Sequence, residues 1–217
     1  MIKVVIFDYD GVIVDSFSNV HGVYQTICKE LNKRCPKSID KFRKIYGFHF
    51  KECYQNLGIA PNEYEKAQEI FKREILKKNP KLFPGIKKVI HELSKKYDLV
   101  LVSANYKQEV FQKLNKFGLA TFFTAILARK NVTDADHVGK SQMIMDFIKK
   151  RNLAPEEIVS IGDRDIDYVV GQKAGLKHII LVEYGWGYHK ETNPHQSMDV
   201  NKPVDLLKAI KTLESEI

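Results

Sequence analysis

The sequence predicts an α/β fold, a parallel β-sheet with helices on both faces, accompanied by a small all-helical domain. Three observations lead to this fold class. Short runs of mostly β-branched, apolar residues recur along the chain, segments with helical spacing lie between them, and one early stretch interrupts the alternation. A chain of 217 residues, 44% of them hydrophobic, has room for one domain with an insert and is too apolar to be disordered or collagen-like.

The expected strands are short and apolar enough to be buried on both faces of a parallel sheet. The first, Ile2–Phe7, is nearly all apolar. Three further runs have the same character and one more is a candidate: Leu99–Val102, Ile158–Ile161, Ile179–Val182 and the candidate Ala125–Ala128.

Apolar side chains three and four residues apart predict helices between these runs. The helices expected around the sheet are Ile86–Lys96, Val110–Phe117, Met143–Lys150 and Val204–Glu214. Residues 17–81 contain no convincing buried strand. They carry helical stretches at Tyr24–Leu31, Phe42–Tyr46 and Glu63–Leu76, the last with Pro61 near its first turn. We therefore expect a helical insert between the first strand and the second.

The net charge of +8 is concentrated in the insert. Residues 16–82 hold 14 Lys or Arg against 7 Asp or Glu. Scattered lysines of this kind are typical of solvated helix surfaces, and the cluster from Lys41 to Lys44 leaves open a surface that attracts anions.

Apolar runs and cysteines indicate the cellular setting. No apolar run approaches the ~20 residues that span a bilayer, and Ile2–Phe7 is too short for a signal peptide. Three cysteines, Cys28, Cys35 and Cys53, form no even disulfide framework. We therefore expect a cytoplasmic protein whose cysteines serve packing.

Ligands of open α/β sheets bind outside the carboxyl ends of the strands, so the residues after the apolar runs form the candidate site. Two carboxylates from separate strands cannot both stay ionised close together without a cation. Oxygen ligands favour Mg²⁺. A lysine and a serine hydroxyl would add the charge and the donor that a transferring phosphoryl group needs. The residues concerned are Asp8, Asp10, Ser103, Ala104, Asn105, Lys140, Asp163 and Asp167. Of these, Lys140 is expected just before a helix that begins near Ser141.

Four segments in chain order resemble the motifs of the haloacid dehalogenase superfamily of phosphohydrolases. They are DYDGVIVDS at residues 8–16, LVSAN at 101–105, Lys140, and GDRDID at 162–167, with GQKAG at 171–175 matching the usual continuation. The insert is similar in position and helical character to the family's first-type cap. The pattern is most similar to phosphoglycolate phosphatases and β-phosphoglucomutase-like phosphatases.

The resemblance implies a Rossmann-like phosphohydrolase core of residues 1–16 and 82–217 and a helical cap of residues 17–81. By the same resemblance, Asp8 would be the nucleophile that forms an aspartyl-phosphate, and Asp10 the general acid and base. Mg²⁺ would be held by Asp8, the backbone carbonyl of Asp10 and Asp163, with Asp167 behind them. Phosphate or substrate contacts would come from Tyr9, Ser103, Ala104, Asn105, Lys140 and Gly47.

Further candidates lie outside these motifs. Residues 46–51 are expected to form a substrate-facing loop of the cap in which Gly47 permits close backbone approach, with packing of the loop's phenylalanines as the alternative. His21 lies one residue later than the position at which relatives carry a histidine. Trp186, between two glycines, is expected to pack or to line the opening of the site.

The residue two after the nucleophile narrows the reaction. Phosphatases and phosphomutases of the superfamily have an Asp there and dehalogenases do not, so Asp10 favours phosphoryl chemistry. We expect a Mg²⁺-dependent phosphomonoesterase, a monomer or homodimer, that acts on a small phosphorylated metabolite and has neither a membrane nor a nucleic acid as partner. A phosphosugar mutase of the β-phosphoglucomutase type shares every motif. A nucleotide or polynucleotide-end phosphatase and a receiver domain fit the sequence less closely.

Overall fold

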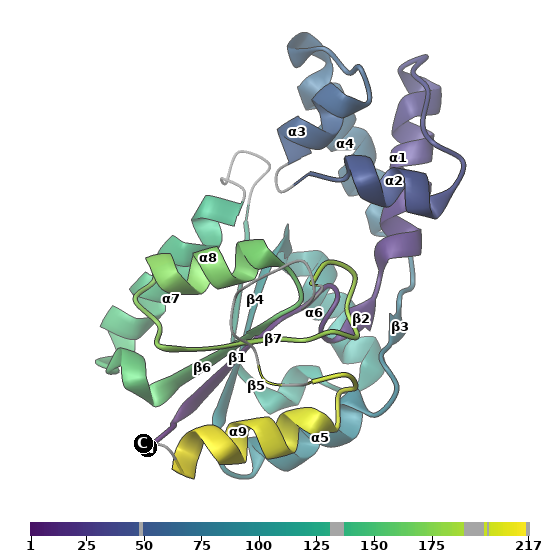
Figure 1. The fold of residues 1–217 in the computed structure, drawn as a ribbon. Helices are drawn as coiled ribbons and strands as arrows, with labels where there is room; N and C mark the ends of the chain where they lie inside the picture. The colour runs from purple at the N-terminus through teal and green to yellow at the C-terminus, as the bar shows by residue number, and fades with distance from the viewer. Residues whose placement is uncertain (48–49, 131–136, 189–197, 199, 216–217) are drawn as a thin grey trace. The chain divides into compact units, whose positions relative to one another are not determined.

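The computed structural model describes residues 1–47, 50–130, 137–188, 198 and 200–215. Its centre is a five-stranded, entirely parallel sheet with the order β5-β4-β1-β6-β7 (Figure 1). The strands are β1 Val4–Asp8, β4 Asp98–Tyr106, β5 Phe123–Arg129, β6 Ile158–Gly162 and β7 His178–Leu181. The predicted α/β class is confirmed, and each strand coincides with one of the five apolar runs.

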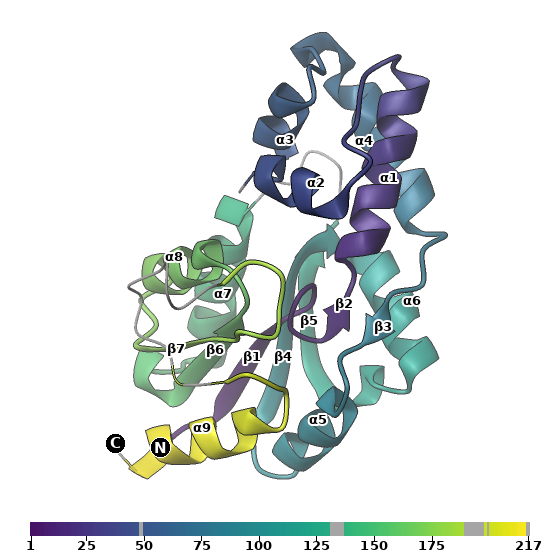
Figure 2. The same ribbon diagram turned by 45° about the vertical axis from the view of Figure 1, so that its right-hand side comes forward.

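Helices cover both faces of the sheet because successive strand residues point to opposite sides. Val5 and Phe7 of β1 pack in one buried cluster with α5, α6 and α9. Val4 and Ile6 pack in another with α7 and α8, and Figure 2 shows these two layers on either side of the strands. The helices are α5 Ile86–Ser94, α6 Lys107–Phe117, α7 His137–Arg151, α8 Asp165–Lys173 and α9 Asp205–Ser215.

Two element boundaries differ from the expectation in ways that affect the site. β4 continues four residues beyond Val102, with a shift in its pairing to β5 between Ser103 and Tyr106. The polar residues expected after this strand therefore lie within its irregular end. Lys140 does not precede its helix, since α7 already begins at His137 and Lys140 lies in its first turn.

The chain divides into two compact units, residues 1–15 with 81–217, and residues 16–80. A two-stranded antiparallel ladder that the sequence did not predict lies at the junction, with Val14 opposite Leu82 and Asp15 opposite Lys81. The strands are too short to leave a sequence pattern. They hold the two ends of the second unit next to each other.

Residues 16–80 are helical and pack around aromatic side chains. Phe42 is fully buried, and its ring lies 5.3 Å from that of Tyr24 and 5.7 Å from that of Phe17, centroid to centroid. The helices are α1 Phe17–Glu30, α2 Ile39–Ile45, α3 Phe50–Asn56 and α4 Tyr64–Ile75, the last entered through a 3₁₀ turn at Pro61–Glu63.

The expected loop at residues 46–51 is only partly a loop. Phe48 and His49 lie outside the described residues, and α3 begins at Phe50. The ring of Phe50 packs 5.4 Å from that of Tyr54, as the packing alternative expects of this residue. The substrate-facing role of the loop stays a prediction. Within the described residues, no helix has both the length and the apolar character needed to cross a membrane.

Candidate active site

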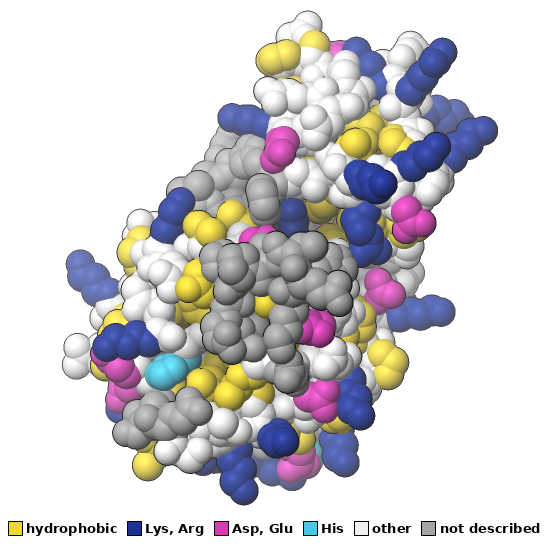
Figure 3. All heavy atoms as spheres, viewed as in Figure 1, with side chains coloured by type: hydrophobic (Ala, Val, Ile, Leu, Met, Phe, Trp, Pro, Cys, Tyr) yellow, Lys and Arg dark blue, Asp and Glu magenta, His cyan; other side chains and the backbone are white. Residues whose placement is uncertain are grey.

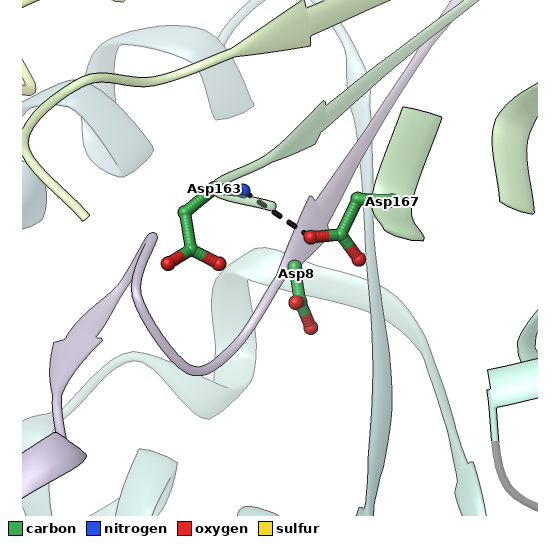
Figure 4. A group of neighbouring side chains, drawn as sticks. All are labelled: Asp8, Asp163 and Asp167. Atoms are coloured by element: carbon green, nitrogen blue, oxygen red, sulfur yellow. Dashed lines mark hydrogen bonds between the residues drawn. The ribbon is translucent and has the colours of Figure 1, made fainter. Parts of the chain in front are cut away.

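Three carboxylates from separate segments meet at the carboxyl end of the central strand. Asp8 ends β1, Asp163 follows β6, and Asp167 lies in the first turn of α8. One oxygen of each lies within 4.8 Å of the others, and Figure 4 shows the three side chains together. The backbone N–H of Asp163 donates to Asp167 Oδ2 at 3.3 Å, the dashed line in the figure.

Lys140 supplies the positive charge of this group. Its Nζ lies 3.0 Å from Asp8 Oδ2 and 3.0 Å from Asp167 Oδ1, and only 5% of the residue is exposed. Burial by itself lowers the pKa of Lys140, but the carboxylates of Asp167 and Asp8 outweigh burial and hold that pKa above its usual 10.5. The lysine therefore stays charged.

One lysine does not balance three carboxylates. Burial raises the pKa of Asp8 well above its usual 3.8. The positive charge of Lys140 opposes this rise only in part, and repulsion from the neighbouring carboxylates adds to it. Burial and then repulsion from Asp167 raise the pKa of Asp163 from 3.8 to about 7. A divalent cation would relieve this excess of negative charge.

Asp163 is held rigidly and presents one oxygen without a partner. Its Oδ2 accepts the backbone N–H of Trp186 at 2.8 Å. Its Oδ1 is buried and has no hydrogen-bond partner among the described residues. A Cβ on Gly11 would lie 2.0 Å from Asp163 Oδ2, and one on Gly185 would lie 2.3 Å from Asp163 Cβ. Only glycines fit around this carboxylate, and the unpartnered oxygen suits a metal ligand.

The second carboxylate of the first motif is fixed by the end of β4. Asn105 Nδ2 donates to Asp10 Oδ2 at 2.5 Å. Ser103, which is buried, accepts the backbone N–H of Asn105 on its Oγ at 3.1 Å. The sequence predicted Asn105 as a phosphate contact, and the structure places its amide on Asp10.

Of the remaining predicted site residues, Ala104 and Tyr9 lie beside the residues just described, and Gly47 lies in the other unit. Ala104 is half-buried in β4 between Ser103 and Asn105, and Tyr9 donates its backbone N–H to Asp8 Oδ1 while its side chain lies in the core. Gly47 belongs to the unit of residues 16–80, so its contact with substrate stays a prediction.

The two residues outside the motifs have clear local roles. His21 is buried, stacks on Phe42 with ring centroids 4.7 Å apart, and has its Nε2 2.6 Å from the carbonyl oxygen of Pro36. Trp186 is also buried and acts on the site through its backbone N–H. The sequence did not predict the hydrogen bond from the Trp186 backbone N–H to Asp163. Only the glycines on either side of Trp186 could have indicated that the backbone approaches this carboxylate closely.

A Rossmann-like sheet with these groups at the end of its central strand defines an enzyme of the phosphoryl-transfer type. The family model described as haloacid dehalogenase-like hydrolase matches residues 5–181. The chain belongs to this family, and the predicted resemblance and the expectation of an enzyme are confirmed.

Known proteins are similar to the chain over nearly its whole length. It is 22% identical to a phosphoglycolate phosphatase of Synechococcus elongatus, with 97% of this chain and 98% of the relative covered. It is 22% identical to a phosphorylated carbohydrates phosphatase of Thermotoga maritima, with 96% and 98% covered. The crystal structure of a predicted phosphatase from Clostridium acetobutylicum superimposes with a TM-score of 0.84 at 22% identity, covering 99% of both chains.

Proposed function

We propose that the chain is a Mg²⁺-dependent phosphomonoesterase that hydrolyses a small phosphorylated metabolite through an aspartyl-phosphate on Asp8. The observation that carries this proposal is the meeting of three carboxylates, two of them paired with Lys140. The third, Asp163, keeps one buried oxygen without a hydrogen-bond partner among the described residues. The names of two relatives, phosphoglycolate phosphatase and phosphorylated carbohydrates phosphatase, favour a small organic phosphate as substrate.

Asp8 has the setting of a nucleophile. Lys140 and the backbone N–H of Tyr9 each hold one of its oxygens, which fixes the direction of the carboxylate. In the first step an Asp8 oxygen bonds to phosphorus and the bond to the alcohol breaks; in the second, water attacks phosphorus and frees Asp8. Bound Mg²⁺ would neutralise the carboxylates and the charge on the phosphoryl oxygens, held by Asp8, the Asp10 carbonyl and Asp163, with Asp167 orienting Lys140.

Asp10 is suited to transfer the proton that each step requires. Asn105 holds one oxygen of its carboxylate and thereby fixes the orientation of the other. Protonated Asp10 gives its proton to the leaving alcohol, and the resulting carboxylate takes one from the attacking water. The first half-reaction leaves Asp10 ionised, and the second restores its proton, so one full turnover returns it to its starting state.

The end of β4 offers donors for the phosphoryl oxygens. A hydroxyl accepts and donates, and Ser103 Oγ already accepts from Asn105, so its own proton is left to donate. The Ala104 backbone N–H and Lys140 complete the set. Residues 17–81 would act as the cap, with Gly47 close to the rest of the substrate.

The distribution of surface charge favours a small substrate over a polynucleotide. On the face drawn in Figure 3, the Lys and Arg side chains form no continuous basic stripe: they are densest at the upper right and lie singly elsewhere. Polynucleotide binding generally uses a gathered basic stripe or patch.

Replacing Asp8 tests the proposal. Asp8→Asn removes the nucleophile while keeping the side-chain size, so we expect steady-state release of phosphate to fall by about 10³-fold or more. The substrates to screen with Mg²⁺ are phosphoglycolate, sugar phosphates and nucleoside monophosphates. The matched control is Asp15→Asn, which changes an exposed carboxylate nearby in the chain and should leave the rate unchanged.

Two outcomes would contradict the proposal. Near-normal turnover by Asp8→Asn would show that another group attacks phosphorus. Conversion of glucose 1-phosphate to glucose 6-phosphate without release of phosphate would instead identify a mutase.

A further inference from the structure

The phosphatase chemistry makes no use of the three thiols of residues 16–80. Cys28 lies on α1, Cys35 in the segment between α1 and α2, and Cys53 on α3. All three are free thiols in the structure. Two of them are brought together by the path of the chain after α1.

The chain turns back on α1 as soon as this helix ends. Asn32 adopts the left-handed conformation with φ of 53°, and the backbone N–H of Lys33 donates to the carbonyl oxygen of Cys28 at 2.7 Å. These are the features of a helix C-terminus that reverses direction. The residues that follow are thereby directed back along the helix that contains Cys28.

A second contact ties this returning segment to α1. A carbonyl oxygen can only accept, so His21 Nε2 donates to the Pro36 carbonyl at 2.6 Å. His21 and Cys28 are seven residues apart, which places them on the same face of the helix. Cys35 lies between the two ties, at Lys33 and at Pro36, and its thiol is hydrogen-bonded to that of Cys28.

The two paired thiols differ in reactivity. The hydrogen bond from Cys28 lowers the pKa of Cys35, which is half-exposed. Arg34 precedes Cys35 in the sequence, and Lys37 follows it by two residues. The same hydrogen bond, followed by burial, raises the pKa of Cys28. An accessible sulfur with thiolate character beside a buried second sulfur is the arrangement of a redox-sensitive pair.

Cys53 provides an internal comparison. It is buried on α3, and burial raises its pKa to about 12 although a hydrogen bond with Tyr24 opposes this. We therefore expect Cys53 to be protonated and slow to react.

We propose that Cys28 and Cys35 are a hydroperoxide-oxidised thiol pair that closes to an intramolecular disulfide. The Cys35 thiolate attacks a peroxide oxygen, so that an S–O bond forms, the O–O bond breaks and the hydroxide that leaves takes up a proton. The Cys28 sulfur then attacks the Cys35 sulfur, loses its proton and displaces the second hydroxide as water. Two thiols and one hydrogen peroxide give one disulfide and two waters, and exchange with a small thiol reverses the change.

The disulfide would fasten the segment before α2 to the last turns of α1. Only the short loop between Cys28 and Cys35 is closed, and its native path already brings the sulfurs together, so the helices need not rearrange. We expect the oxidised protein to melt at a higher temperature than the reduced protein, because the crosslink restricts the unfolded chain.

The proposal is tested on the full-length protein with hydrogen peroxide, followed by non-reducing peptide mapping and intact mass. Wild type and the matched control Cys53→Ser should each lose two hydrogens and yield a Cys28–Cys35 linked peptide, and dithiothreitol should restore the mass. Cys35→Ser should consume peroxide at least about tenfold more slowly. In Cys28→Ser no disulfide should form, and Cys35 should be oxidised beyond the sulfenic acid to the sulfinic acid.

Three results would overturn the proposal: a disulfide that includes Cys53, a crosslink between two chains, or equal oxidation of all three thiols without a linked peptide. The melting temperature gives an independent readout, since peroxide should raise it in wild type and in Cys53→Ser and leave it unchanged in Cys28→Ser. None of these readouts requires phosphatase activity, so the proposed function and the thiol pair can fail separately.

Discussion

Removing the divalent cation should make the stability of this protein fall steeply with pH. The cause is Asp163, whose pKa without a cation rises from 3.8 to about 7 through burial and repulsion by Asp167. The folded state then binds the proton more tightly than the unfolded chain does. This carboxyl contributes its full stability below pH 3.8 and loses it as the pH rises to about 7.

The size of this effect follows from the pKa difference. The interval from 3.8 to about 7 corresponds to about 4 kcal/mol of unfolding free energy, of which about 3 kcal/mol falls between pH 5 and pH 8. Mg²⁺ at the proposed site would be held by the ionised carboxylates and should reverse the loss. At a concentration 100 times its dissociation constant it would return about 2.7 kcal/mol.

The measurement is urea unfolding at pH 5, 6, 7 and 8, once with EDTA and once with Mg²⁺, on wild type and Asp163→Asn. The difference between the two proteins reports Asp163 together with its effect on the neighbouring Asp8. It separates both from groups elsewhere that titrate in this range, such as Glu109, whose pKa burial raises to about 7. Asp163→Asn should lose both the Asp163 part of the pH slope and the response to Mg²⁺. An EDTA curve equally steep in the two proteins, or an equal response of both to Mg²⁺, would refute the reasoning.

Two further predictions concern the Asp10–Asn105 pair and the ion pair on α6. Asp10→Asn should reduce turnover of alkyl phosphates far more than that of p-nitrophenyl phosphate, whose leaving group needs no proton, and Asn105→Ala should show the same bias more weakly; equal losses on both esters in steady-state assays would exclude the acid role. Glu109 and Lys113 form a buried ion pair at 2.6 Å, so Glu109→Gln should cost about 3–5 kcal/mol in urea unfolding by taking this carboxylate from the lysine. Adding Lys113→Met should recover most of that loss, and a double variant as unstable as the single one would contradict the argument.

The sheet and the carboxylates of the motifs were predictable because they depend on local composition and chain order. A run such as Val4–Phe7 has no stable alternative to a buried strand, and parallel strands bring their carboxyl ends to one edge. The proximity of Asp8, Asp163 and Asp167 follows from this topology.

What the sequence could not supply are contacts made by the backbone and by long-range packing. The backbone N–H of Trp186 donates a hydrogen bond to Asp163, and almost any residue at this position could do the same. Only the neighbouring glycines therefore indicate this contact in the sequence. The spacing of Cys28 and Cys35 likewise shows nothing until the chain is seen to reverse at Asn32. The start of α7 upstream of Lys140 was missed because its apolar pattern becomes regular only from Met143 onward.

The short ladder of β2 and β3 has a consequence for how this protein can diversify. It brings the two ends of the 65-residue unit Ser16–Pro80 to adjacent positions. Next to the ladder, the Phe83 backbone N–H donates to the Ile13 carbonyl oxygen at 3.1 Å and strengthens this connection. Any segment whose ends lie equally close could replace residues 16–80 without disturbing the register of the main sheet. With residues 17–81 as the proposed cap, selectivity for new compounds could evolve by exchange or remodelling of one contiguous stretch of the gene, while the residues at the carboxyl end of the main sheet stay unchanged.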